Sequence, residues 1–297
     1  MMPVFNAGAY LDPAIESLIA QSFRDWELIA VDDGSRDDSP TRLREWSQRD
    51  PRVRPFLQRE NRGIPATLNF ALTHARGEYL AFLNHDDLAK PNRLEMQLAF
   101  LREHPKIDLL GSALENVDER GATIGARSMP TSDLEIHWLA LLDCPVRQSS
   151  LVGRSEAFRQ HGLRFDENVA SHSDYDFVAR AIRSVAAANL PEALLQYRIH
   201  PKNSSRVRRD MFVESGARIS FDAIRHELPD FPITLDDVRL IRAALLGYKK
   251  HGQQLQLPAL KRAVRLYLDL FAAFAQKHQG HPLLARLETL SPQVLTA

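Results

Sequence analysis

The stretch GEYLAFLNHDDLAKPNRLEMQ, from Gly77 to Gln97, decides the fold class. Its apolar run, residues 79–83, is short enough for a buried strand, and a helical pattern begins at Pro91, a residue type that suits the first turn of a helix. The polar turn NHDD, residues 84–87, separates the two. Its two adjacent carboxylates repel each other and resist burial unless a cation or hydrogen-bond donors meet them. The stretch therefore predicts a strand, an acidic turn that needs a partner, and a helix.

The same alternation of strand and helix extends from this stretch in both directions, up to about residue 120. Strands are predicted over residues 26–31, 53–57, 79–83 and 107–113, and helices over residues 9–21, 40–48, 65–74 and 91–103. Strands that alternate with helices of this length indicate βαβ units. The fold class is therefore α/β, with a mainly parallel sheet.

Further along the chain the pattern is mixed and then becomes helical. Up to residue 205 we predict helices over residues 132–142 and 175–184, and strands over residues 148–152 and 194–200. Beyond it, Thr234 and Asp237 resemble a capping box, and an apolar stripe on a later helix comprises Leu260, Val264, Leu268 and Phe271. We therefore expect two parts, residues 1–205 and a C-terminal helical region over residues 206–297.

Composition excludes several classes of protein. The 297 residues include 38 basic and 38 acidic side chains, so no net charge attracts the chain to nucleic acid, and we expect no nucleic-acid partner. The single cysteine, Cys144, cannot form an internal disulfide, which suits the cytoplasm. No apolar run approaches the roughly 18 residues of a membrane span. For the stripe of the helical region three alternatives stay open: peripheral membrane contact, packing on the rest of the chain, or packing on a second copy.

Three acidic turns stand at comparable ends of predicted elements. They are VDDGS with Asp32 and Asp33, NHDD, and SHSDYDF with Asp174. Each alone is compatible with a turn or a helix cap. However, a parallel sheet binds ligands beyond the carboxyl ends of its strands, so three such turns favour one acidic pocket. Such a pocket suits Mg²⁺ or Mn²⁺ carrying a diphosphate, because these cations take carboxylate and phosphate oxygens together.

At this point an ordered series of motifs resembles a known family. The series MPVFNAGAYL, ELIAVDDGS, NRGIPATLN, GEYLAFLNHDD, PNRLEMQ, SDYDF and LLQYRIH, over about residues 2–205, resembles the family 2 glycosyltransferases of the GT-A fold. The resemblance implies a nucleotide-binding sheet with flanking helices, of which the first strand, at MMPVF, is short here. It also implies transfer, with inversion, of a sugar from a nucleotide-diphosphate sugar to a hydroxyl of a saccharide or glycolipid acceptor, in cell-surface polysaccharide or glycolipid synthesis.

The resemblance also implies roles for residues that match its motifs. On the nucleotide side, Asp32 or Asp33 reads the nucleoside, and the same pocket involves Pro3, Val4, Asn6 and Asn61. In the family's D-x-D motif the first carboxylate is replaced here by Asn84, which can still hydrogen-bond a ribose or a metal-bound water.

The remaining implied roles concern the metal and the base. Asp86 falls at the usual ligand of a divalent metal, Mn²⁺ or Mg²⁺, and His200 matches a histidine near the diphosphate or metal. An ordinary histidine at a strand end is the alternative for His200. Asp174 matches the catalytic base, while Ser173 replaces the glutamate that precedes the base in the family.

Other classes of function compete with this interpretation. Asn84, Ser173 and the short first strand depart from the family pattern, so a non-catalytic nucleotide-sugar-binding or scaffolding protein on the same fold is the main alternative. A nicotinamide-dependent oxidoreductase is disfavoured, because no G-x-G-x-x-G follows a strand near the N-terminus.

Overall fold

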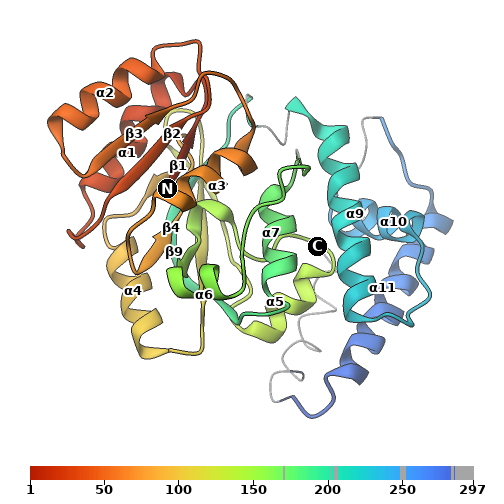
Figure 1. Ribbon diagram of the computed structural model, residues 1–297. Helices are drawn as coiled ribbons and strands as arrows, with labels where there is room; N and C mark the ends of the chain where they lie inside the picture. Colours follow the sequence, from red (N-terminus) through yellow and green to blue (C-terminus); the bar gives the residue numbers. More distant parts are fainter. Residues whose placement is uncertain (170, 202, 204–206, 248–251, 282–283, 285–297) are drawn as a thin grey trace.

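The structure, a computed structural model, describes residues 1–169, 171–201, 203, 207–247, 252–281 and 284. The predicted boundary between residues 205 and 206 lies outside the described residues. Two hydrogen-bonded sheets occupy one part of the molecule, and the C-terminal helices stand together beside them, next to α5 and α7 (Figure 1).

The first sheet contains three parallel strands. In spatial order they are β1 (Met2–Val4), β2 (Leu28–Asp32) and β3 (Val53–Leu57). The connections carry a 3-10 helix, η1 (Gly8–Tyr10), and the helices α1 (Leu11–Ile19), α2 (Ser39–Arg49) and α3 (Ile64–His74). Every residue of β2 is buried, as its apolar sequence predicts, and Val4 and Asp32 lie side by side at the ends of their strands. The prediction for residues 53–57 is confirmed at both ends.

The second sheet is mixed. Its strands, in spatial order, are β4 (Tyr79–Ala81), β8 (Val152–Arg154), β6 (Leu109–Val117), β9 (Ala187–Arg198) and β5 (Leu88–Ala89), with β7 (Thr123–Arg127) also paired to β6. β6 and β9 are parallel, and the other pairs are antiparallel. The N–H of Leu83 donates to Met1 O at 3.1 Å, which joins the two sheets. The α/β fold with flanking helices is confirmed.

Helix α4 (Arg93–Glu103) supports the sheet beneath the NHDD turn. Arg93 and Gln97, one helical turn apart, are both buried. Arg93 donates to Phe82 O at 2.9 Å, and Gln97 donates to Ser150 O at 2.8 Å. Burial lowers the pKa of Arg93 to about 10, against the opposing charge of Asp87. These polar side chains of the PNRLEMQ motif therefore satisfy backbone carbonyls that would otherwise be buried without donors.

One predicted strand is wrong. Residues 148–152 were expected to be extended, but Gln148–Ser150 form the 3-10 helix η2, and β8 begins at Val152. The hydroxyl and the N–H of Ser150 both bond Arg147 O, each at 2.9 Å. Local bonds of this kind allow a serine-rich segment to turn instead of joining a sheet. The helices of this part of the chain are α5 (Asp133–Ala140), α6 (Ser155–Gln160) and α7 (Ser173–Ala181).

The C-terminal helices are α9 (Arg209–Glu227), α10 (Leu235–Leu245) and α11 (Leu257–Lys277). The capping box of Thr234 and Asp237 is confirmed at the start of α10. The three helices share an apolar core with Trp138 of α5. The predicted stripe is wrong at Leu268, which is 46% exposed, because α11 turns a neighbouring face inward, formed by Ala263, Tyr267, Leu270 and Phe274. That face is therefore covered by this chain itself.

No helix in the described part of the chain is long and apolar enough to cross a membrane.

Candidate active site

Two adjacent aspartates stand at the end of β2, Asp32 as its last residue and Asp33 directly after it, and their surroundings differ. Both carboxylate oxygens of Asp33 accept backbone hydrogen bonds, from the N–H of Arg62 at 2.8 Å and that of Gly63 at 2.9 Å. Asp32 accepts one bond, from the N–H of Ser35 to Oδ2 at 3.1 Å. Its Oδ1 is buried and accepts no hydrogen bond from the described residues. Asp33 therefore holds the loop before α3, whereas Oδ1 of Asp32 can still accept a hydrogen bond from a bound ligand.

The loop that Asp33 holds lies backbone against backbone with the VDDGS turn. Gly34 has a φ of +71°, and a Cβ at this position would lie 2.7 Å from the carbonyl carbon of Glu60. Only glycine permits this approach. It places Asn61, whose side chain is exposed, beside the turn that carries Asp32.

The end of β1 reaches the same edge of the sheet. Asn6 has a φ of +48°, and its Oδ1 accepts the N–H of Arg36 at 2.8 Å. Pro3 O accepts a hydrogen bond from His85 Nδ1 at 3.1 Å, which ties β1 to the NHDD turn. Val4 was expected to line the pocket, but its side chain is fully buried in the apolar core. Its contribution to the site is its carbonyl oxygen, which accepts the N–H of Asp33 at 2.7 Å.

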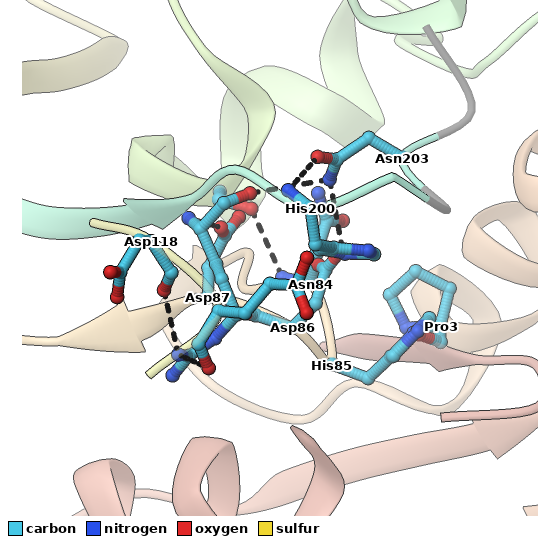
Figure 2. A network of polar contacts seen from close by, with 11 residues as sticks. Pro3, Asn84, His85, Asp86, Asp87, Asp118, His200 and Asn203 are labelled. Carbon is cyan, nitrogen blue, oxygen red and sulfur yellow. Dashed lines mark hydrogen bonds and ion pairs between the residues drawn. The ribbon is translucent and has the colours of Figure 1, made fainter. Parts of the chain in front are cut away.

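Asp86 of the NHDD turn faces His200, which follows β9. Their Oδ2 and Nε2 atoms are 3.0 Å apart (Figure 2). The ring of Tyr10 packs on His200 with 4.7 Å between ring centroids. Burial alone would raise the pKa of Asp86, but the hydrogen bond with His200 and the charges of His85 and His200 outweigh it, so the pKa lies below its usual range. Asp86 is therefore ionised at neutral pH.

Asp87 has the opposite character. It is fully buried, and burial, followed by the charge of Asp86, raises its pKa to about 8. Its Oδ1 accepts the N–H of Arg198 at 3.0 Å, and Arg198 Nε donates to Asp86 O at 3.0 Å. The repulsion between the adjacent carboxylates is thus reduced, because one is ionised while the other keeps its proton at neutral pH.

Residues 143–149, here called the bridging segment, link this turn to Asp174. At one end Gln148 Nε2 donates to Asn84 Oδ1 at 3.0 Å. At the other, Cys144 Sγ lies 3.7 Å from Asp174 Oδ2. Burial, followed by the charge of Asp174, raises the pKa of the Cys144 thiol. Sequence reasoning missed this segment, because contacts of 64 and 30 residues in separation leave no local pattern.

Asp174 lies in the first turn of α7, and the C-terminal helices support that turn. Its Oδ1 accepts the N–H of Tyr175 at 2.9 Å. The Tyr175 hydroxyl donates to Ala140 O at 2.8 Å and lies 2.9 Å from Ser220 Oγ of α9. The fully buried Arg242 of α10 donates to Ser220 Oγ at 2.9 Å. The helical region therefore fixes the helix that carries Asp174.

Tyr197 of β9 lies within electrostatic reach of both the NHDD turn and Asp174. Burial raises the pKa of its phenol, and the charges of Asp87, Asp86 and Asp174 act in the same direction. Three carboxylates, from the NHDD turn and from α7, therefore lie within electrostatic reach of one side chain. Tyr197 stands inside the LLQYRIH motif, directly before Arg198, but an internal strand residue gave no signal of this position.

The donor atoms at this edge suit a divalent cation only in part. Among the described residues, no group of three or more histidine, cysteine, aspartate or glutamate side chains is arranged to hold a metal ion. Asp86 and His200 nevertheless bring an ionised carboxylate and an imidazole together. Mg²⁺ and Mn²⁺ are commonly held by one or two carboxylates with substrate phosphates completing the shell. The pair therefore fits such a cation if a diphosphate supplies the other ligands.

Comparison with known structures shows the same fold. The crystal structure of S. aureus TarS 1-349 in complex with UDP-GlcNAc is 18% identical, with a TM-score of 0.64 over 92% of this chain and 80% of that one. The mannosyltransferase PcManGT from Pyrobaculum calidifontis, in complex with GDP-Man and Mn2+, is 17% identical, with a TM-score of 0.59 over 99% and 79% of the two chains. The fold is thus that of the GT-A glycosyltransferases.

Sequence comparison gives the family. The profile described as Glycosyl transferase family 2 matches residues 1–162. An uncharacterized glycosyltransferase of Haemophilus influenzae is 30% identical over 250 residues, which cover 82% of this chain and 76% of that protein. One from Rickettsia felis is 31% identical over 212 residues, and the matched part spans 35% of that longer protein. The chain belongs to glycosyl transferase family 2.

Proposed function

We propose that the protein is an inverting, metal-dependent glycosyltransferase that moves a sugar from a nucleotide-diphosphate sugar to an acceptor hydroxyl. The observation that carries the proposal is the bridging segment, which touches Asn84 at one end and Asp174 at the other. The segment therefore links the NHDD turn to the candidate base, and in this proposal both face one space, as a direct displacement between donor and acceptor requires.

In this proposal the nucleoside lies at the ends of β1 and β2. Asp32 supplies the buried Oδ1 that lacks a described donor, and a hydroxyl or ring N–H of the nucleoside satisfies it. Asp33 acts indirectly, because its oxygens already hold the loop that presents Asn61. Pro3 and Asn6 border the same edge through their loop contacts.

The diphosphate lies at the NHDD turn. Asp86 and His200 hold the divalent cation, Mn²⁺ or Mg²⁺, which when bound stabilises the negative charge of the leaving diphosphate. Asn84 Oδ1 is occupied by Gln148, so the amide nitrogen of Asn84 is the group that remains to donate to a ribose or phosphate oxygen. Burial and the charge of Asp86 raise the pKa of Asp87, so Asp86 is the carboxylate of this turn that is ionised most readily.

Asp174 is the general base. Its carboxylate takes the proton of the acceptor hydroxyl as the hydroxyl oxygen attacks the anomeric carbon, and the bond from that carbon to the diphosphate oxygen breaks. A single displacement of this kind inverts the anomeric centre. General base catalysis contributes about 10² to 10⁴-fold. The acceptor we propose is a saccharide or glycolipid in cell-surface polysaccharide or glycolipid synthesis, and the unpaired, buried Cys144 suits a reaction in the reducing cytoplasm.

Replacement of the base tests the proposal. Hydrolysis of UDP-GlcNAc and GDP-mannose, in which water takes the place of the acceptor hydroxyl, is followed by release of nucleoside diphosphate. It is measured for the wild type, Asp174→Asn and the control Asp176→Asn, whose carboxylate pairs with Arg180 instead. We expect Asp174→Asn to keep donor binding and to lose about 10² to 10⁴-fold in kcat, and Asp176→Asn to stay within a few-fold of wild type. Near-normal turnover by Asp174→Asn excludes it as the base. A wild type that binds donors without turnover favours the non-catalytic alternative.

A further inference from the structure

Asn203 lies at the centre of the contacts around Asp86, although no motif pointed to it. Its side chain is 8% exposed. Asn203 Oδ1 accepts the N–H of His200 at 2.6 Å. Asn203 Nδ2 donates to Arg198 O at 3.2 Å and lies 3.5 Å from Asp86 Oδ2, at the long limit of a hydrogen bond (Figure 2). The side chain of Asn203 thus contacts both candidate metal ligands, Asp86 and His200, and also Arg198 of β9.

These contacts fix the orientation of the amide. An asparagine side chain has one carbonyl oxygen and two N–H donors, and here the oxygen and both donors have partners. With oxygen and nitrogen exchanged, the amide would direct an N–H at the N–H of His200 and an oxygen at Arg198 O. The network therefore permits one arrangement only.

The main chain of Asn203 forms two further hydrogen bonds, which with its side-chain contacts are here called the clamp. Its N–H donates to His200 O at 3.1 Å, which closes a tight turn from His200. Its carbonyl accepts the N–H of Val207 at 3.1 Å, at the approach to the C-terminal helices. Asn203 therefore ties the position of His200 both to the NHDD turn and to the chain that leads to α9.

Asp86 is held at its side chain and at its main chain by the same set of residues. His200 Nε2 and Asn203 Nδ2 face a single oxygen, Oδ2, while Arg198 Nε holds the backbone carbonyl of Asp86. The backbone carbonyl of Arg198 in turn accepts a hydrogen bond from Asn203 Nδ2. The closed ring of contacts leaves Asp86 and His200 little freedom to separate.

We propose that Asn203 is a positioning residue that sets the distance and orientation of Asp86 and His200 as the protein's share of a divalent cation site. The inference rests on the function proposed above, in which these two residues hold the cation. Groups that orient metal ligands typically contribute 10 to 100-fold to metal affinity. Asn203 touches no substrate atom in this account and acts only through its neighbours.

Three variants separate positioning from simple structural support. Asn203→Ala removes the clamp. Asn203→Asp keeps the oxygen that receives the N–H of His200. Its second oxygen replaces Nδ2 and faces Arg198 O and Asp86 Oδ2, a repulsive contact that a bound cation relieves. Asn189→Ala is the matched control, because Asn189 is also buried on β9 and donates to the carbonyls of Pro130 and Pro145 at 2.7 and 3.0 Å, away from Asp86.

The measurement is the dissociation constant of Mn²⁺ by calorimetry, with UDP, GDP or dTDP present, whichever stabilises the wild type most. Thermal unfolding of each variant without metal is recorded beside it. We expect Asn203→Ala to weaken Mn²⁺ binding about 10 to 100-fold, Asn203→Asp to bind at least as tightly as wild type, and Asn189→Ala to lose stability with unchanged Mn²⁺ affinity.

The possible outcomes are distinct. If Asn203→Ala binds Mn²⁺ within twofold of wild type, or if Asn203→Asp loses as much affinity as Asn203→Ala, Asn203 does not position the site and the inference fails while the proposed function stands. If the wild type binds no Mn²⁺ with any of the three nucleotides, both the metal assignment and this inference fail.

Discussion

The adjacent residues Asp33 and Asp32 should respond differently to replacement by asparagine, because their hydrogen bonds differ. Asp33→Asn replaces an oxygen that accepts a backbone N–H, from Arg62 at 2.8 Å or from Gly63 at 2.9 Å, by an amide nitrogen that can only donate. Asp32→Asn can keep the oxygen that serves Ser35 and places its nitrogen where Oδ1 receives no described hydrogen bond. The first change should therefore destabilise the fold more than the second.

The magnitude follows from the hydrogen bonds lost. A bond to a charged group contributes about 1.5 to 3 kcal/mol, and Asp33→Asn loses one, weakens the other and sets two N–H groups against each other. Since Asp33 is 3% exposed, water replaces little of this. We expect the free energy of unfolding to fall by roughly 2 to 4 kcal/mol, a decrease of about 3 to 6 °C in Tm for a chain of this size.

The assay combines denaturant unfolding with a donor titration of both variants. Asp33→Asn should lose stability and, through its loop, some donor affinity. Asp32→Asn removes no described hydrogen bond, so it should lose less stability than Asp33→Asn, yet bind the nucleotide more weakly. A loss below about 1 kcal/mol for Asp33→Asn, or an equal loss for Asp32→Asn, would refute the division of roles.

Two further predictions concern pH and the helical region. Burial, followed by the charge of Arg242, lowers the pKa of His172 to about 3. The folded state therefore keeps this imidazole neutral, while the unfolded chain binds a proton below about pH 6.5. The free energy of unfolding should fall as the pH drops from 6.5 towards 3. His172→Asn, which tolerates the φ of +58°, should flatten urea-unfolding free energies over that range, and an unchanged slope would contradict the assignment. Trp138 packs on the rings of Tyr267, Phe271 and Phe274 at centroid distances of 5.5, 5.0 and 5.2 Å, so Trp138→Ala should lower the free energy of unfolding by about 3 to 5 kcal/mol. A loss under about 1 kcal/mol would mean that the C-terminal helices do not depend on this contact.

Local patterns in the sequence predicted much of the fold. The predicted strand over residues 53–57 and the capping box at Thr234 were confirmed, because both are set by a few consecutive residues. Where a non-local partner decides, the prediction failed. Leu268 was placed in the apolar stripe of α11, but a different face of α11 packs on Trp138 of α5. Trp138 lies about 130 residues earlier in the chain, so no local pattern indicates it.

The site shows the same division between local and non-local information. The acidic turns predicted one acidic pocket at the ends of the strands, and this stays a prediction. The two residues that the resemblance implied as metal ligands, Asp86 and His200, lie 3.0 Å apart. The sequence could not assign different roles to Asp32 and Asp33, since the difference lies in the backbone N–H groups of residues 62 and 63. Asn203 was within reach of sequence reasoning, because a small amide three residues after His200 is typical of a turn.

The central claim is a nucleotide-diphosphate site that a divalent cation completes at Asp86. The measurement that tests it most directly is the Tm of the wild type and of Asp86→Ala with UDP, GDP or dTDP, each with and without Mn²⁺, because a ligand that binds only the folded state raises stability with the logarithm of its concentration. The account predicts that one nucleotide stabilises the wild type more with Mn²⁺ than without, and that Asp86→Ala loses this Mn²⁺-dependent increment. Stabilisation of the wild type by none of the three nucleotides, or an increment that survives in Asp86→Ala, would contradict it.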